Sequence, residues 1–161
     1  MKFILDRMLG RLTRWMRLLG YDILYIKKQD DDDRTFLALA EKEGGILISR
    51  DKILINKAIK GGLRAYLVGS SDIIGQLREM KKEFDIRLEP EMDRCCLCNS
   101  MIRKILPDEM AIVRRTDYVY PSRLNSTTDF WLCENCQQVY WQGKHWENIK
   151  EMAEKVIMSY K

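Results

Sequence analysis

The sequence contains a single histidine, His145, and no long apolar run among its 161 residues. The lone histidine disfavours a mechanism in which histidine side chains transfer the protons. No stretch approaches the roughly 18 apolar residues needed to cross a bilayer, and the N-terminus lacks the apolar core of a secretory signal. Internal repeats and low-complexity linkers are also missing. We therefore expect a cytoplasmic protein with no membrane partner.

The composition is that of a globular chain. Hydrophobic residues make up 46% and charged residues 32%, enough for a packed core and a solvated surface. The length allows one ordinary domain, or a small domain with a satellite too small to hold a core unaided. The net charge of +4 is a weak indication of nucleic-acid binding until the charges are located. Of the five cysteines, an odd number, four form two Cys-x-x-Cys pairs, which favours metal binding over disulfides in a cytosolic chain.

Residues 1–90 alternate short apolar runs with amphipathic helical patterns. The runs lie at 2–5, 23–26, 46–49 and 65–68, and a helical pattern follows each of them. This β-α alternation predicts a mostly parallel sheet flanked by helices, an α/β fold. The runs are continuously apolar, as expected for strands covered on both faces.

Residues 91–161 differ in character and form a predicted second domain. They contain all five cysteines and three of the four tryptophans. We expect short strands at 110–113 (MAIV) and 139–141 (VYW), separated by polar loops. A final helix is predicted at about 146–160, with an apolar face that packs back on a neighbouring element.

Acidic residues follow the predicted strands. Asp6 comes directly after the first strand and Asp51 after the third. Ligands of an open parallel sheet gather at the carboxyl ends of its strands, where the strand order reverses. If the second and third strands flank the first, Asp6 and Asp51 are neighbours. Asp33, interpreted as the N-cap of the second helix, and Asp72, after the fourth strand, lie on the same rim.

Converging carboxylates repel one another unless a cation lies between them. Mg²⁺ or Mn²⁺ suits such oxygen ligands and supports hydrolysis of a phosphodiester bond by an activated water. The alternative is that each aspartate only caps a helix. Asp30, Asp31 and Asp32 are interpreted as a solvated loop, although Asp31 or Asp32 replaces Asp33 if the helix boundary is shifted by one or two residues.

Basic residues gather near these acids. The first helix has four arginines on one side and no acidic residue to compensate them, so it could follow a phosphate backbone. The alternative is a solvated helix surface. Two more basic residues flank Asp51 and could contact a scissile phosphate or pair with the acids. The candidate RNA-binding residues are Arg7, Arg11, Arg14, Arg17, Arg50 and Lys52.

Two Cys-x-x-Cys pairs, Cys95 with Cys98 and Cys133 with Cys136, predict a four-sulfur zinc site. A closed site of this kind is structural and stabilises a segment with little core. The long gap between the pairs predicts an inserted loop around residues 120–129. We expect Cys96 to be a packed thiol.

Residues next to the predicted zinc site have further expected roles. Asn99 and Gln137 follow the second cysteine of their pairs, where a left-handed backbone suits asparagine better than glutamine. The module's aromatic residues and His145 would supply its core and, for one or two rings, a platform for base stacking. His145 is also a minor alternative zinc ligand.

Several motifs occur in the order seen in one known family. They are KFILDRMLGRLTRWMRLLGYD, the stretch DRTFLALA from Asp33, ILISRD, RCCLCN and CENCQQVYWQGKHW. Together they resemble the PIN-like RNase family with an inserted zinc ribbon, named for the C-terminal domain of the Mut-7 exonuclease. The resemblance covers nearly the whole chain. The sequence departs from the family's pattern at Ser49, where relatives often have threonine, and at Gln137, where glycine is frequent.

The resemblance implies a PIN-type α/β fold and metal-dependent cleavage of RNA. Asp6, Asp33 and Asp51 match the family's acidic positions, and the four paired cysteines match its zinc site. We expect a nuclease domain over residues 1–90 and a zinc ribbon with a C-terminal helix over 91–161. Ribosomal RNA and transfer RNA are candidate substrates. The alternatives are a non-catalytic RNA- or ribosome-binding module and a toxin controlled by an antitoxin.

Overall fold

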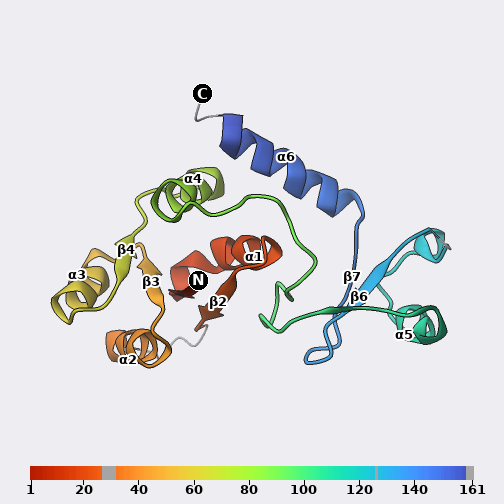
Figure 1. Cartoon of the computed structure of the whole chain (residues 1–161), viewed down its shortest axis with the longest axis horizontal. Helices are drawn as coiled ribbons and strands as arrows, with labels where there is room; N and C mark the ends of the chain where they lie inside the picture. The colour runs from red at the N-terminus through yellow and green to blue at the C-terminus, as the bar shows by residue number, and fades with distance from the viewer. Residues whose placement is uncertain (27–31, 126, 159–161) are drawn as a thin grey trace.

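The computed structural model describes residues 1–26, 32–125 and 127–158. The N-terminal part contains a four-stranded parallel sheet in the order β2-β1-β3-β4 (Figure 1). Phe3 pairs with Ile23 on one side and with Ile46 on the other, so β1 lies between β2 and β3. The α/β fold expected from the sequence is confirmed. The strands are β1 (Lys2–Leu5), β2 (Asp22–Tyr25), β3 (Ile46–Ser49) and β4 (Ala65–Leu67).

Helices cover both faces of this sheet. Phe3 and Leu5 share one hydrophobic core with residues of α1 and α4, whereas Ile4 and Leu47 share another with residues of α2 and α3. Successive strand residues point to opposite faces, so both sets are buried, which explains the continuously apolar runs. The helices are α1 (Gly10–Leu18), which follows the 3-10 turn η1 (Arg7–Leu9), α2 (Asp33–Glu43), α3 (Lys52–Lys60) and α4 (Ile73–Phe84).

The terminal helix α6 (Lys144–Met158) returns to the first core. Its residues Ala153 and Val156 belong to the cluster built by α1 and α4, and Figure 1 shows α6 running beside α4. The predicted packing of this helix on a neighbour is confirmed. The last two residues of the predicted helix lie outside the described residues. None of the described helices is both long and apolar enough to cross a membrane.

The cysteine-rich part forms a small antiparallel sheet in the order β5-β6-β7. The predicted strand at 139–141 is confirmed as β7 (Val139–Trp141). The other strands are β5 (Arg103–Lys104) and β6 (Phe130–Leu132). Together with the clustered cysteines described below, this sheet forms the expected zinc ribbon.

The strand predicted at 110–113 is wrong, because this segment forms the helix α5 (Ala111–Arg114). The turn η2 (Pro107–Glu109) precedes it, and the side chain of Glu109 accepts a hydrogen bond from the Leu106 N–H. Proline and acidic residues favour the start of a helix, and these signals outweigh the apolar composition of the segment. This helix and the turn η3 (Pro121–Arg123) make up the insertion between β5 and β6.

The ribbon is hydrogen-bonded to the edge of the parallel sheet. The side chain of Asn99 accepts a hydrogen bond from the Ile23 N–H at 3.0 Å and donates one to Asp22 Oδ1 at 2.7 Å. Arg94 Nε donates to the Gly20 carbonyl at 3.3 Å. These bonds occupy groups of the outer strand β2 and fix the first cysteine pair beside it.

Candidate active site and metal centre

Asp6 directly follows β1 and is almost fully buried, with 3% of its surface exposed. Its Oδ1 accepts a hydrogen bond from the Met8 N–H at 2.9 Å, and its Oδ2 accepts one from the Ser49 hydroxyl. The residue therefore caps the turn η1, as the capping alternative predicted. Capping uses only one carboxylate oxygen, so it does not account for the contact with Ser49.

Ser49 links Asp6 to Asp51. Its Oγ donates to Asp6 and accepts a hydrogen bond from the Asp51 N–H at 2.8 Å. The Oδ1 of Asp51 in turn accepts hydrogen bonds from the N–H groups of Ile53 at 2.8 Å and Leu54 at 3.2 Å, which caps α3. Because β1 and β3 are adjacent and parallel, the structure brings Asp6 and Asp51 to neighbouring strand ends at the reversal point of the sheet.

Burial raises the pKa of the Asp6 carboxyl above its ordinary value. The hydrogen bonds from Ser49 and Met8 lower this pKa in part, and the nearby Asp51 raises it further. A negative charge at Asp6 is thus poorly solvated and repelled by its neighbour. A divalent cation bound between the two carboxylates would reverse both effects.

The acidic residues around the second helix lie differently from the prediction. The N-cap of α2 is Asp32, whose Oδ1 accepts hydrogen bonds from the N–H groups of Arg34 and Thr35, so the assignment of Asp33 as N-cap is wrong. Asp33 is the first helical residue, and its carboxylate pairs with Lys57 Nζ of α3 at 2.6 Å. Asp30 and Asp31 lie outside the described residues.

Asp72 caps α4 after β4, with Oδ1 2.9 Å from the Gly75 N–H. That hydrogen bond lowers the pKa of the Asp72 carboxyl. Across the described residues, the aspartates and glutamates form no group of three ligand atoms within 4.8 Å of one another. The acidic residues at this edge that share a hydrogen-bonded neighbour are Asp6, through its carboxylate, and Asp51, through its N–H group.

The arginine row of the first helix divides into two parts. Arg7, Arg11 and Arg14 are exposed, but Arg17 is 6% exposed. Arg17 donates to the Ile23 carbonyl at 2.8 Å from Nη2 and to the Leu97 carbonyl at 2.8 Å from Nη1. The expectation that Arg17 shares an exposed face with the others is wrong. Each successive residue at a spacing of three lies about 60° further around the helix axis. The row of arginines therefore turns toward β2 and the ribbon at Arg17.

The remaining basic candidates flank Asp51. Arg50 and Lys52 are both exposed at the carboxyl end of β3. They lie at the same edge of the sheet as Asp6, where a phosphate next to the acidic pair would be within reach of cationic side chains.

The four paired cysteines converge, with all four Sγ atoms within 4.8 Å of one another. Cys95 Sγ is 3.5 Å from Cys136 Sγ, and Cys98 Sγ is 3.4 Å from Cys133 Sγ. These separations exceed a disulfide bond of about 2.05 Å. They approach the roughly 3.8 Å expected for sulfurs of a tetrahedral site with Zn–S bonds of about 2.3 Å. The cluster therefore fits a zinc ion held by four thiolates.

The backbone around the cysteines is folded for metal binding. The N–H of Asn99 donates to the Cys95 carbonyl at 2.9 Å, and the N–H of Gln137 donates to the Cys133 carbonyl at 2.8 Å. Asn99 has φ 72° and Gln137 has φ 60°, so the predicted left-handed conformation is confirmed at both positions. The Tyr140 hydroxyl lies 3.0 Å from Cys95 Sγ. Burial raises the pKa of Tyr140, which keeps the hydroxyl protonated as a donor to the sulfur.

Comparison with known protein families places this arrangement in context. The family model described as Mut7-C RNAse domain matches residues 1–153. The chain belongs to the Mut7-C RNAse domain family. Searches of curated proteins and of solved structures found no match for this Mut7-C domain. Membership indicates a role in RNA cleavage or RNA metabolism, with RNA as the expected substrate.

Sequence reasoning about this Mut7-C domain missed two hydroxyl side chains. Ser49, which departs from the family pattern, connects the Asp6 carboxylate to the Asp51 N–H group. Thr13 is buried in α1 with an Oγ1 that has no hydrogen-bond partner among the described residues. The position of Ser49 at a strand end two residues before Asp51 was a usable signal. Thr13 carries no such signal, because its environment depends on the packing of distant segments.

Proposed function

We propose that this Mut7-C domain hydrolyses RNA phosphodiester bonds with Mg²⁺ or Mn²⁺ bound at Asp6 and Asp51. The observation that supports the proposal most is the buried Asp6 carboxyl, linked through Ser49 to Asp51 where the strand order reverses. A carboxyl that only capped a turn would gain nothing from burial beside a second acid. Binding a cation would explain both the burial of Asp6 and its position beside Asp51.

The donor set fits such an ion. Mg²⁺ prefers oxygen ligands and commonly takes one or two carboxylates, with waters and phosphate oxygens completing its shell. The Oδ1 of Asp51 is used by the helix cap, which leaves Oδ2 for a ligand. When bound, the ion would activate a water and offset the charge on the phosphate. Asp33, or Asp32 in its place, would complete the site from α2.

Each nearby residue has a proposed role. Ser49 orients the Asp6 carboxylate through its hydroxyl. Arg7, Arg50 and Lys52 would contact phosphates beside the acids, and Lys57 holds Asp33 at the start of α2. Asp33 would have to exchange this ion pair for the metal.

The zinc has a structural role in this proposal. Four thiolates leave no open position for substrate, so the ion stabilises the ribbon and does not take part in hydrolysis. Residues 1–90 would form the catalytic domain, and residues 91–161 would assist RNA binding. Ribosomal RNA and transfer RNA remain the candidate substrates, in the cytoplasm.

The experiment measures cleavage of mixed single-stranded and structured RNAs by zinc-loaded protein, with and without added Mn²⁺. Omitting the divalent ion is preferable to adding chelator, because a chelator would also remove zinc. Asp6→Asn and Asp51→Asn should each abolish cleavage and the binding of Mn²⁺ measured by paramagnetic resonance. Asp85→Asn is the matched control, since Asp85 is exposed and far along the chain from the site, at the end of α4. Cleavage that survives Asp6→Asn would refute the mechanism.

A non-catalytic RNA-binding module remains the second candidate. The observation in its favour is that Asp33 is paired with Lys57 and no third carboxylate of the described residues joins Asp6 and Asp51. In that case the protein would bind no Mn²⁺ at these residues. RNA affinity would then depend on the arginines of α1 and not on the acids.

A further inference from the structure

A cleft of about 600 Å³ lies between α1, strand β7 and the start of α6. Five aromatic side chains line it, and two exposed arginines of α1 stand at its rim. Such a volume is typical of a site for a ligand of nucleotide size. The aromatic residues are Trp15, Tyr118, Tyr140, Trp141 and Trp146, and the arginines are Arg11 and Arg14.

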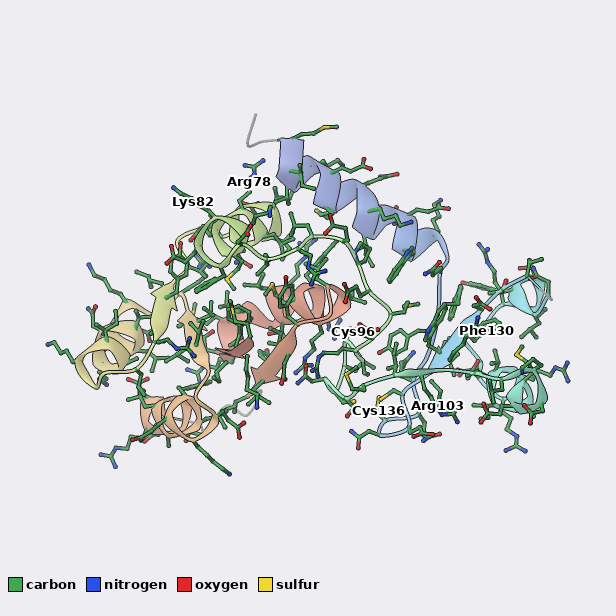
Figure 2. All side chains as sticks on the ribbon, in the orientation of Figure 1. Arg78, Lys82, Cys96, Arg103, Phe130 and Cys136 are labelled. Atoms are coloured by element: carbon green, nitrogen blue, oxygen red, sulfur yellow. The ribbon has the colours of Figure 1, made fainter. Side chains whose placement is uncertain are left out.

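A second hollow of about 460 Å³ continues from this cleft along α1. The two share Arg11, Arg14 and Cys96, and Figure 2 shows Cys96 between α1 and the ribbon. The far end of the second hollow is lined by Tyr25, the last residue of β2. That end lies at the same carboxyl edge of the sheet as Asp6. The two hollows therefore follow α1 from the carboxyl end of β2 to the aromatic cleft.

The second hollow also contains an unsatisfied polar group. Thr13 lines it and is 1% exposed, and its Oγ1 is the buried side-chain oxygen that lacks a partner among the described residues. Buried hydroxyl groups are almost always hydrogen-bonded, so this oxygen is an exception among the described residues. It is covered by the surrounding side chains and does not itself face a ligand in the hollow.

Two of the rings are suited to stacking. Tyr118 and Trp141 are nearly parallel, with an interplanar angle of 16° and centroids 6.5 Å apart. The Tyr118 hydroxyl accepts a hydrogen bond from the Val139 N–H at 2.9 Å, which fixes its ring against β7. Tyr118 is nevertheless 39% exposed, whereas Trp146 is 7% exposed and serves as a wall. Fixed and partly exposed rings bind a base with little loss of side-chain freedom.

We propose that this cleft, between α1 and the zinc ribbon, binds an unpaired nucleobase of the RNA strand, whose phosphates lie on Arg11 and Arg14. Arginines beside aromatic rings are the combination that binds single-stranded nucleic acid, by charge along the backbone and by stacking of the bases. A base in a duplex is already stacked and paired and cannot enter. The inference rests on the RNA binding of the proposed function and not on cleavage.

The test uses the Asp6→Asn protein, which should bind RNA without cutting it. Fluorescence anisotropy would compare a single-stranded oligoribonucleotide about ten nucleotides long with the same backbone lacking bases and with a duplex. The base-bearing single strand should bind most tightly. Tyr118→Ala should weaken its binding roughly 5- to 100-fold and leave the strand without bases unaffected. The matched control is Tyr120→Ala, because Tyr120 is 71% exposed and does not line the cleft.

Two further variants keep the test valid if Tyr118→Ala disturbs the ribbon. Tyr118→Phe keeps the ring but loses the bond to Val139, so it should bind the base-bearing strand more weakly than wild type and more tightly than Tyr118→Ala. Arg14→Gln should weaken both single strands equally and lower the slope of log affinity against log salt by about 0.7. Lys82→Gln removes one charge from α4, away from the ribbon in Figure 2, and should change neither slope nor affinity.

The results separate this inference from the proposed catalysis. Equal affinity for strands with and without bases, equal effects of the Tyr118 and Tyr120 alanine variants, or duplex binding as tight as single-strand binding would each overturn the inference. If wild-type protein shows base-dependent binding but no Mn²⁺-dependent cleavage, the cleft stands and the nuclease proposal fails.

Discussion

Replacing Arg17 with methionine should destabilise the protein without acting through RNA. The guanidinium donates to the Ile23 carbonyl at 3.1 and 2.8 Å and to the Leu97 carbonyl at 2.8 Å, joining α1, β2 and the first cysteine pair. Hydrogen bonds from charged donors contribute about 1.5–3 kcal/mol each, and carbonyls left unpaired add a cost. These bonds share one side chain and do not add fully, so we expect a loss of about 3 kcal/mol.

Urea unfolding followed by circular dichroism measures this loss. With a slope of roughly 2 kcal/mol per molar urea, the midpoint should fall by about 1.5 M. Arg14→Met is the matched control, because Arg14 lies one turn earlier and is exposed. It should change stability by less than about 0.5 kcal/mol and weaken RNA binding. If Arg17→Met leaves the midpoint unchanged and weakens RNA binding as Arg14→Met does, the structural role assigned to Arg17 is wrong.

Three other predictions concern the acidic site and the zinc ribbon. Because the pKa of Asp6 is raised in the folded state, its contribution to stability is present at acid pH and is lost as the pH rises through the folded pKa. Without divalent ions, the Asp6→Asn protein should therefore become more stable relative to wild type as the pH rises from acid to neutral, measured by urea unfolding at several pH values. A difference in the free energy of unfolding that stays constant with pH would contradict the assigned burial of Asp6. Cys98→Ser should weaken zinc binding and speed amide hydrogen exchange in residues 93–143, while the amides of β1 and β3 stay protected. If exchange became faster to the same extent in the ribbon and in the parallel sheet, the ribbon would not be stabilised separately. Gln137→Gly should raise the free energy of unfolding by about 1 kcal/mol, because φ is 60° at this position and glycine adopts it without strain. Asn99→Gly should lower the free energy of unfolding, because the Asn99 side chain also forms hydrogen bonds with Ile23 and Asp22. Thermal melting of both variants measures these opposite changes in stability.

The elements of the first 90 residues were predictable because local patterns and tertiary packing agree there. Apolar runs such as residues 46–49 are buried on both faces, and the glycine after the second helix adopts the left-handed conformation that ends it. The segment at 110–113 shows the limit. Its apolar residues suit a strand or a helix equally, and the turn η2 directly before it, closed by Glu109, leads the chain into the helix.

The candidate site was predictable in outline for a topological reason. Once four β-α units form a parallel sheet, the residues after β1 and β3 can meet only at its carboxyl edge. The helix boundary near Asp33 does not follow from the sequence, because a run of consecutive aspartates offers several equivalent caps, and Asp32 is the residue that caps α2.

The sequence by itself determined the α/β order, the two cysteine pairs and the acids after the strands, since spacing and periodicity are properties of the chain alone. Only the tertiary structure decided that Arg17 is buried, that Ser49 bridges Asp6 and Asp51, and that α1 and the ribbon enclose an aromatic cleft. Each of these depends on which distant segments pack together, and burial and hydrogen bonding at such contacts have no local pattern in the chain.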